Sequence, residues 1–169
     1  MQALRQWSVR HASALTWVYD ACARVAPHLS RPLRWAGLRR VERVLLPFER
    51  ASKQLLFDCK MCGQCVLSST GMSCPMNCPK SLRNGPCGGV RDNGNCEVKP
   101  DMRCVWVEAY KGSERIPGGI AAMSKVQVAV DQRQQGRSSW LRVVREKTEP
   151  PAKSATPAVS AAPTKSLSP

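Results

Sequence analysis

The chain has 169 residues, with 26 Lys or Arg against 12 Asp or Glu, and a formal net charge of +14. No stretch of about 18 apolar residues occurs, so we expect no transmembrane segment, and the absence of a secretory-type apolar run at the start favours a cytoplasmic location. The charge is compatible with an acidic protein partner, a membrane surface or nucleic acid, and it does not choose among them.

The first predicted helix lies near the N-terminus. Its apolar positions recur every three or four residues, as on one face of a helix: Leu4, Trp7, His11, Leu15, Val18, Cys22 and Val25. We expect Pro27 to end it, and we interpret His11 and Cys22 as core residues because no further ligand residues lie nearby. The Arg-containing start has no acidic residue before Asp20, which is also typical of an organellar transit peptide, so a targeting role and a docking role both stay open.

Two more helices are predicted before the cysteines. Ser30 is a candidate N-cap for a helix whose apolar stripe consists of Leu33, Trp35, Leu38, Val41, Val44 and Leu45. Three arginines lie off this stripe and are interpreted as a solvated polar face: Arg39, Arg40 and Arg43. Pro47 is expected to start a third, short helix that reaches Phe57. Residues 1–56 are therefore predicted to form an amphipathic, basic helical region.

Eight of the nine cysteines are concentrated between Phe57 and Trp106. Their spacing is C-x2-C-x2-C, then after eight residues C-x3-C, and then single cysteines after eight, eight and seven residues. Two residues between cysteines allow a tight turn to direct both sulfurs at one metal. The segment has too little Val, Ile and Phe for a core of its own, so we predict that metal stabilises it. The predicted ligands are Cys59, Cys62, Cys65, Cys74, Cys78, Cys87, Cys96 and Cys104.

The three closely spaced cysteines favour iron-sulfur ligation. A C-x2-C-x2-C run matches the front half of the bacterial ferredoxin run, and the C-x3-C-P of Cys74 and Cys78 is like its end. We therefore predict one or two 4Fe-4S clusters. Zinc at one or both four-cysteine sites is the alternative, whereas disulfides are disfavoured because neighbouring cysteines of the run are badly placed to bridge. Spacing does not tell which cysteines share a centre.

Weaker elements are predicted after the cysteines. A short helix should begin near residue 105, the alternating KVQVAV at 125–130 is a strand or an extended segment, and Ser138 or Ser139 should cap a last helix. Pro, Ala, Ser and Thr dominate residues 149–169, which we expect to be a disordered tail. The predicted fold class is mainly α, with irregular metal-stabilised loops in a Cys-rich module at 57–110 and an extension with a short helix at 111–148.

No catalytic constellation accompanies the cysteines. His11 and His28 are the only histidines, and no carboxylate pair has a setting that indicates acid–base work. The GPCGG stretch lacks the Lys and the preceding strand of a phosphate loop, so we interpret its glycines as turn formers around a ligand. The sequence therefore indicates a metal-carrying subunit whose work is electron transfer or scaffolding.

Several motifs carry a family resemblance. The eight cysteines, CPKSLRNGPCGG, CEV and CVW all occur in one order across residues 55–110. In this the chain resembles the methylenetetrahydrofolate reductase C-terminal domain family, found in the small, cysteine-rich MetV-type partner of the flavoprotein reductase and in related fused proteins. The stretch VAVDQRQQGRSSWL is similar to the family's downstream segment, which implies that residues 128–141 are ordered.

The resemblance implies an accessory subunit that passes electrons between an external donor and the flavin of a methylenetetrahydrofolate reductase-like flavoprotein in one-carbon metabolism. This chain would bind neither folate nor flavin itself, and its partner could instead be a corrinoid-linked methyl-transfer protein. The N-terminal helices, Trp106 and Trp140 are the candidate docking surface, although both tryptophans are equally candidates for the core. A zinc module that organises a methyl-transfer complex without redox work is the alternative, and a basic zinc protein that binds nucleic acid is a remote one.

Overall fold

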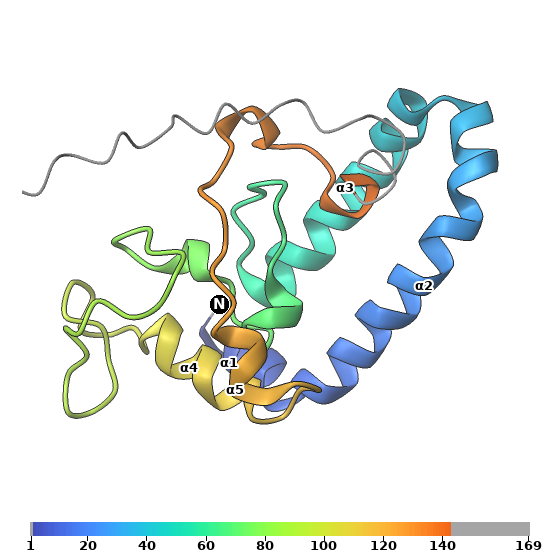
Figure 1. The fold of residues 1–169 in the computed structure, drawn as a ribbon. Helices are drawn as coiled ribbons and strands as arrows, with labels where there is room; N and C mark the ends of the chain where they lie inside the picture. The colour runs from blue at the N-terminus through green and yellow to red at the C-terminus, as the bar shows by residue number, and fades with distance from the viewer. Residues whose placement is uncertain (1, 143–169) are drawn as a thin grey trace, which may run out of the picture.

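The computed structural model describes residues 2–142, and within them the fold is mainly helical, as predicted. Figure 1 shows that the first three helices follow one another closely, whereas the later helices are separated from them and from each other by loops. The described part contains no named strand, and its β pairing consists of two isolated bridges, Val90 with Cys96 and Asn95 with Arg103. The helices are α1 (Gln2–Arg10), α2 (Ala12–Ala36), α3 (Leu38–Phe57), α4 (Val105–Ser113) and α5 (Gly119–Met123). The predicted tail at 149–169 lies outside the described residues.

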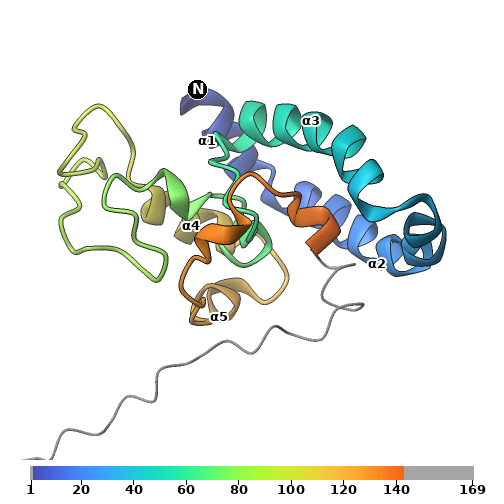
Figure 2. The same ribbon diagram turned by 90° about the horizontal axis from the view of Figure 1, so that it is seen from above.

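The N-terminal helices form a long hairpin on one side of the molecule. Helices α2 and α3 run beside one another along this side, and the cysteine-rich loops with α4 and α5 lie on the other (Figures 1 and 2). The chain turns between the two long helices at Gly37, whose φ of +84° lies in the left-handed region that favours glycine. Gly37 therefore provides the turn between the two helices of the hairpin.

The helix boundaries predicted near the N-terminus are wrong. The chain breaks at His11, between α1 and α2, where the sequence pattern predicted one continuous helix. Helix α2 then continues past Pro27 and past the predicted N-cap Ser30 to Ala36. Pro47 lies inside α3 and does not start a helix. A proline removes one backbone donor and favours a bend, but it does not oblige a long, otherwise regular helix to stop.

The main hydrophobic core lies where the start of α2, the end of α3 and α5 meet the cysteine-rich loops. Its buried members are Ala12, Phe57, Leu67, Met72 and Ile116, with Leu15, Tyr19, Leu56, Cys65, Cys74 and Ala122 packed against them. His11 and Cys22, predicted as core residues, are both exposed. Leu15 faces inward as predicted, but after the break at His11 it is Tyr19 that joins it, in place of Val18 and Cys22.

A close approach of two glycines positions the cysteine-rich loop against α4. A Cβ added at Gly112 would lie 2.0 Å from the backbone oxygen of Gly71, and one added at Gly71 would lie 2.2 Å from the backbone carbon of Gly112. Gly71 also has a φ of +54°. Only glycine permits this backbone contact, which brings the loop that carries Cys74 onto the helix that follows Cys104.

The segment after α5 returns over the first cysteine turn. Gly136 N donates to Met61 O at 2.8 Å, Gln135 Nε2 donates to Lys60 O at 2.8 Å, and Gln64 Nε2 donates to Asp131 O at 3.1 Å. The KVQVAV stretch at 125–130 is not a strand in this structure. The expected cap is confirmed at Ser138, whose Oγ accepts a hydrogen bond from Leu141 N at 3.2 Å where residues 139–142 turn helical.

Candidate metal centre

The first cysteine turn begins at the C-terminus of α3. Asp58 takes a left-handed conformation with φ 50°, and its N–H donates to Gln54 O, while the N–H of Cys59 donates to Lys53 O. This arrangement satisfies carbonyls that the end of a helix leaves without partners. It also fixes the direction in which the chain leaves α3 towards Cys59. Phe57, the last residue of α3, is buried in the main core.

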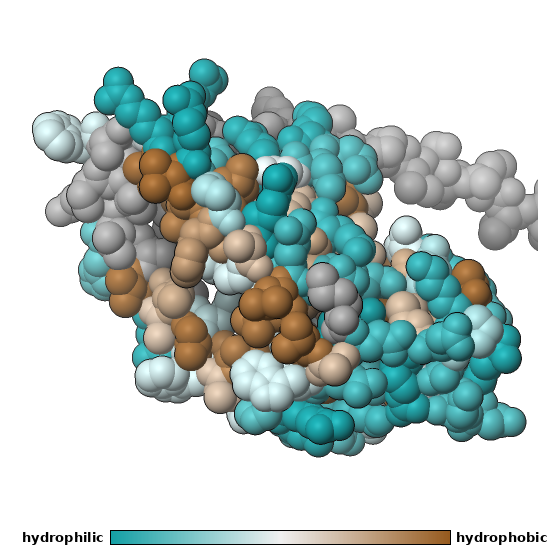
Figure 3. All heavy atoms as spheres, turned by 180° about the vertical axis from the view of Figure 1, so that it is seen from behind, coloured by the Kyte–Doolittle hydropathy of each residue, from teal (hydrophilic) through white to brown (hydrophobic). Residues whose placement is uncertain are grey.

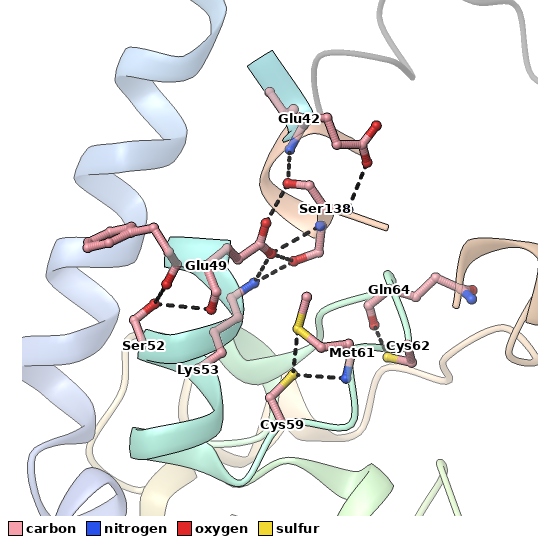
Figure 4. A network of polar contacts seen from close by, with 12 residues as sticks. Glu42, Glu49, Ser52, Lys53, Cys59, Met61, Cys62, Gln64 and Ser138 are labelled. Atoms are coloured by element: carbon pink, nitrogen blue, oxygen red, sulfur yellow. Dashed lines mark hydrogen bonds and ion pairs between the residues drawn. The ribbon is translucent and has the colours of Figure 1, made fainter. Parts of the chain in front are cut away.

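The turn that carries Cys59, Cys62 and Cys65 contains further residues in the left-handed conformation. Met61 has a φ of 50° and Gly63 a φ of 72°, and a non-glycine residue in that region is uncommon. The N–H of Met61 consequently points at Cys59 Sγ, 3.3 Å away (Figure 4). Backbone N–H groups directed at sulfur stabilise thiolate charge and are a feature of cysteine-ligated metal sites.

Four of the eight predicted ligands line one pocket. Cys59, Cys62 and Cys65 come from the first turn, and Cys74 comes from the loop beyond the 3-10 helix η1 (Leu67–Ser69). The cavity between these side chains is small, about 20 Å³. Its other lining residues include Glu49, Lys53, Met61, Leu67 and Arg137. The structure therefore places Cys59, Cys62, Cys65 and Cys74 around one pocket. The spacing of the cysteines alone did not tell which of them lie together.

These thiols influence one another electrostatically. Burial raises the pKa of Cys74 to about 12, and the nearby Cys59 and Cys65 add to that rise. Burial also raises the pKa of Cys59, against the hydrogen bond from Met61 N, and Cys65 contributes in the same direction. A thiol whose pKa is raised by burial and by neighbouring thiols disfavours the negative charge of a thiolate, and a bound cation reverses that balance.

The remaining four predicted ligands are not brought together in the same way. Cys96 and Cys104 are buried in two different small clusters, and Cys87 is exposed with its Sγ 3.7 Å from Glu97 Oε1. Cys78 is half-buried just after the 3-10 helix η2 (Pro75–Asn77). Across residues 2–142, no three His, Cys, Asp or Glu side chains have the spacing of a metal-binding set, so even the first four share a pocket without forming a closed ligand set.

A buried ion pair borders the pocket and was not predicted. Glu49 is 0% exposed and Lys53 is 5% exposed, and Lys53 Nζ lies 2.6 Å from Glu49 Oε1. Ser139 N donates to the same carboxylate at 3.1 Å, and the Ser138 hydroxyl also donates to it (Figure 4). The spacing of four residues between Glu49 and Lys53 was a usable sequence signal for the pair. It gave no indication of the two serines.

The charge state of Glu49 follows from these partners. Burial acts to raise its pKa, but Lys53 and the hydroxyls of Ser138 and Ser139 outweigh burial and lower the pKa below its usual value. Glu49 is thus a carboxylate that ties α3 to the start of the 139–142 helix. Lys53 in turn lies beside the thiols and offsets part of the rise that burial causes in the pKa of Cys59.

The two candidate docking tryptophans differ in their placement. Trp106 is 5% exposed, and its Nε1 donates to Leu82 O at 3.3 Å, so it belongs to the core. Trp140 is half-buried, with its ring 5.1 Å from Lys53 Nζ and 6.3 Å from the ring of Phe48. Of the two tryptophans, Trp140 is therefore the one that connects the exposed surface with the cysteine pocket, through its contact with Lys53.

The comparison with known protein families agrees with the cysteine-rich motifs of the sequence. None of the helices within residues 2–142 combines the length and the apolar character needed to cross a membrane. No curated protein and no solved structure matches the chain. The family described as methylene-tetrahydrofolate reductase C terminal matches residues 38–133, which span α3, every cysteine of the predicted ligand set, α4 and α5. This match covers more than half of the 169 residues, and the chain belongs to that family.

Proposed function

We propose that this chain is an accessory electron-transfer subunit, carrying iron-sulfur, of a methylenetetrahydrofolate reductase-like flavoprotein. One observation carries the proposal: three cysteines of one turn and a fourth from a separate loop line the same pocket. A cubane cluster takes three cysteines from one turn and a fourth from elsewhere, so this donor set fits a 4Fe-4S cluster. Such a cluster accepts and releases single electrons. Zinc bound by the same thiols would do neither.

The protein's own residues have definable roles in this proposal. Cys59, Cys62, Cys65 and Cys74 supply the thiolates. Met61 N, directed at Cys59 Sγ, and the charge of Lys53 stabilise the negative charge that four thiolates bring to the pocket. Because Glu49 holds Lys53 in place, the ion pair serves to orient a positive charge towards the cysteines.

We assign Cys78, Cys87, Cys96 and Cys104 to a second centre, either another cluster or zinc. Cys96 N donates to Met102 O and Cys104 N donates to Gly94 O, so both cysteines are anchored on one looped segment. The apolar groups around them are small: one cluster consists of Cys96, Met102 and Val105 alone. A segment with so little core is a typical host for a structural metal.

The catalytic steps on folate belong, in this proposal, to the flavoprotein, in the cytoplasm. A corrinoid-linked methyl-transfer protein is the other partner that the family membership admits. The distinguishing experiment is anaerobic purification of the full chain with analysis of iron, acid-labile sulfide and zinc, followed by electron paramagnetic resonance of the reduced sample.

We expect about four iron and four sulfide per cluster, a rhombic signal after reduction, and reoxidation of the cluster by the oxidised flavoprotein. A colourless protein that contains zinc and no iron would instead support the scaffolding alternative and eliminate electron transfer.

A further inference from the structure

Helix α2 has apolar residues on two opposite faces. Ala12, Leu15 and Tyr19 pack into the core, whereas Trp17 is 68% exposed and Trp35 is 94% exposed. Trp17 and Trp35 are eighteen residues apart, which is five turns of 3.6 residues, so they lie on the same side of the helix. Val18 and Val25 fall within about 100° of that side and are also exposed. A helix with two apolar faces is normally covered on both.

Helix α3 repeats this arrangement. Its exposed apolar residues are Val44, Phe48 and Leu55, which lie within about 40° of one another around the helix axis. Glu49 and Lys53 occupy its buried side. Figure 3 shows hydrophobic side chains gathered over the side of the molecule formed by α2 and α3, while the side of the cysteine-rich loops is mostly hydrophilic. We call these residues the hairpin surface: Trp17, Val18, Val25, Trp35, Val44, Phe48 and Leu55.

The charge that accompanies the hairpin surface on α3 is entirely positive. The acidic residues of α3 are Glu42 and Glu49, and both bind the 138–139 segment through hydrogen bonds. The exposed charged residues of α3 are four arginines: Arg39, Arg40, Arg43 and Arg50. Apolar stripes bordered by basic side chains complement an apolar face bordered by carboxylates.

We propose that the hairpin surface is the docking site for an acidic contact face on the flavoprotein partner, an inference that rests on the proposed function. The ring of Phe48 contacts that of Trp140, Trp140 lies over Lys53, and Lys53 lines the cysteine pocket. A partner seated on α3 is therefore adjacent to the site of electron transfer. A second copy of this chain would bring basic faces together, which like-charge repulsion opposes.

The hairpin surface extends beyond the part of the chain that the family shares. The match begins at residue 38, so α1 and α2 precede it, and Trp17, Val18, Val25 and Trp35 all belong to α2. The docking contacts of α2 are thus an addition to the family module, and those of α3 lie within it.

The test measures the affinity of the anaerobically purified full-length chain for the purified flavoprotein, at low and at high salt. We expect Trp35→Ser and Val44→Ser together to weaken binding by about tenfold or more, because exposed tryptophans at interfaces are frequent hot spots. Val126→Ser is the matched control for Val44→Ser, since Val126 is 80% exposed and Val44 is 78% exposed. Arg40→Gln should slow association and reduce the salt dependence, while Lys99→Gln, also exposed, should not.

The outcomes are distinguishable. If the wild-type chain fails to bind the flavoprotein, the proposed function fails and this inference with it. If the wild-type chain binds and the hairpin-surface variants bind equally well, with unchanged circular dichroism and iron content, the inference alone is overturned. It is also overturned if these variants lose binding to phosphatidylglycerol vesicles, or lose self-association in sedimentation, while their affinity for the flavoprotein is intact.

Discussion

Cys62 and Cys22 are thiols of the same chain in contrasting surroundings. Cys62 is 7% exposed within the first cysteine turn, and Cys22 is exposed on α2, away from the pocket. We predict that Cys62→Ser removes the metal of the first centre and makes the cysteine-rich segment sensitive to protease, because metal-binding free energy here is also folding free energy. Iron analysis and limited proteolysis measure both effects.

Cys22→Ser is the control for this prediction, and it should change neither the metal content nor the cleavage pattern. A Cys62→Ser protein with full metal content and full resistance would show that the first turn is not a ligand site. Loss of metal in Cys22→Ser would show that the ninth thiol had been misassigned.

The contact between α3 and the 139–142 helix depends on the Glu49–Lys53 pair. Replacing Glu49 by Gln leaves Lys53 as a buried charge without its carboxylate, and such losses typically cost about 3–5 kcal/mol. We expect Glu49→Gln to lower the free energy of unfolding by roughly 3 kcal/mol in urea titrations of metal-loaded protein, with protection from hydrogen exchange lost at Ser139 and Leu141.

The double variant Glu49→Leu with Lys53→Met tests the physical reason. Replacing both partners of a buried ion pair by apolar residues of similar volume is often neutral, so most of the lost stability should return. A double variant as unstable as Glu49→Gln would mean that the carboxylate acts mainly through Ser138 and Ser139, and not through Lys53.

Helix type was predictable from the sequence, but several helix ends were not. Apolar spacing predicted helices before the cysteines and at residue 105, and a serine before a helix predicted the cap at Ser138. The signals at Pro27 and Pro47 failed because the hydrogen-bond ladder of a long helix continues around a single missing donor. Gly37 was the actual boundary, and only its positive φ in the folded chain distinguishes it from a helical glycine.

At the scale of the whole molecule, the cysteine pocket depends on contacts between distant segments. Cys74 lines the same pocket as the first turn, its loop is held against α4 by the contact of Gly71 with Gly112, and residues 135–136 hydrogen bond to Lys60 and Met61. Spacing predicted that the cysteines act as ligands, whereas their grouping follows from tertiary packing that no local pattern encodes. The same holds for the hairpin surface, because periodicity gives a stripe but does not say which stripe the core covers.

The whole-molecule prediction concerns removal of metal. The main core draws on α2, α3 and α5 as well as on Leu67 and Met72 of the loops, while the loops around Cys96 and Cys104 have only small apolar clusters. A strong chelator under reducing conditions should therefore abolish hydrogen-exchange protection between residues 57 and 106, and far-UV circular dichroism should fall much less because most helical residues lie in α1 to α3. Exchange measured by mass spectrometry resolves the two regions in one sample, and unchanged protection at 57–106 after extraction would mean that apolar packing alone holds these loops.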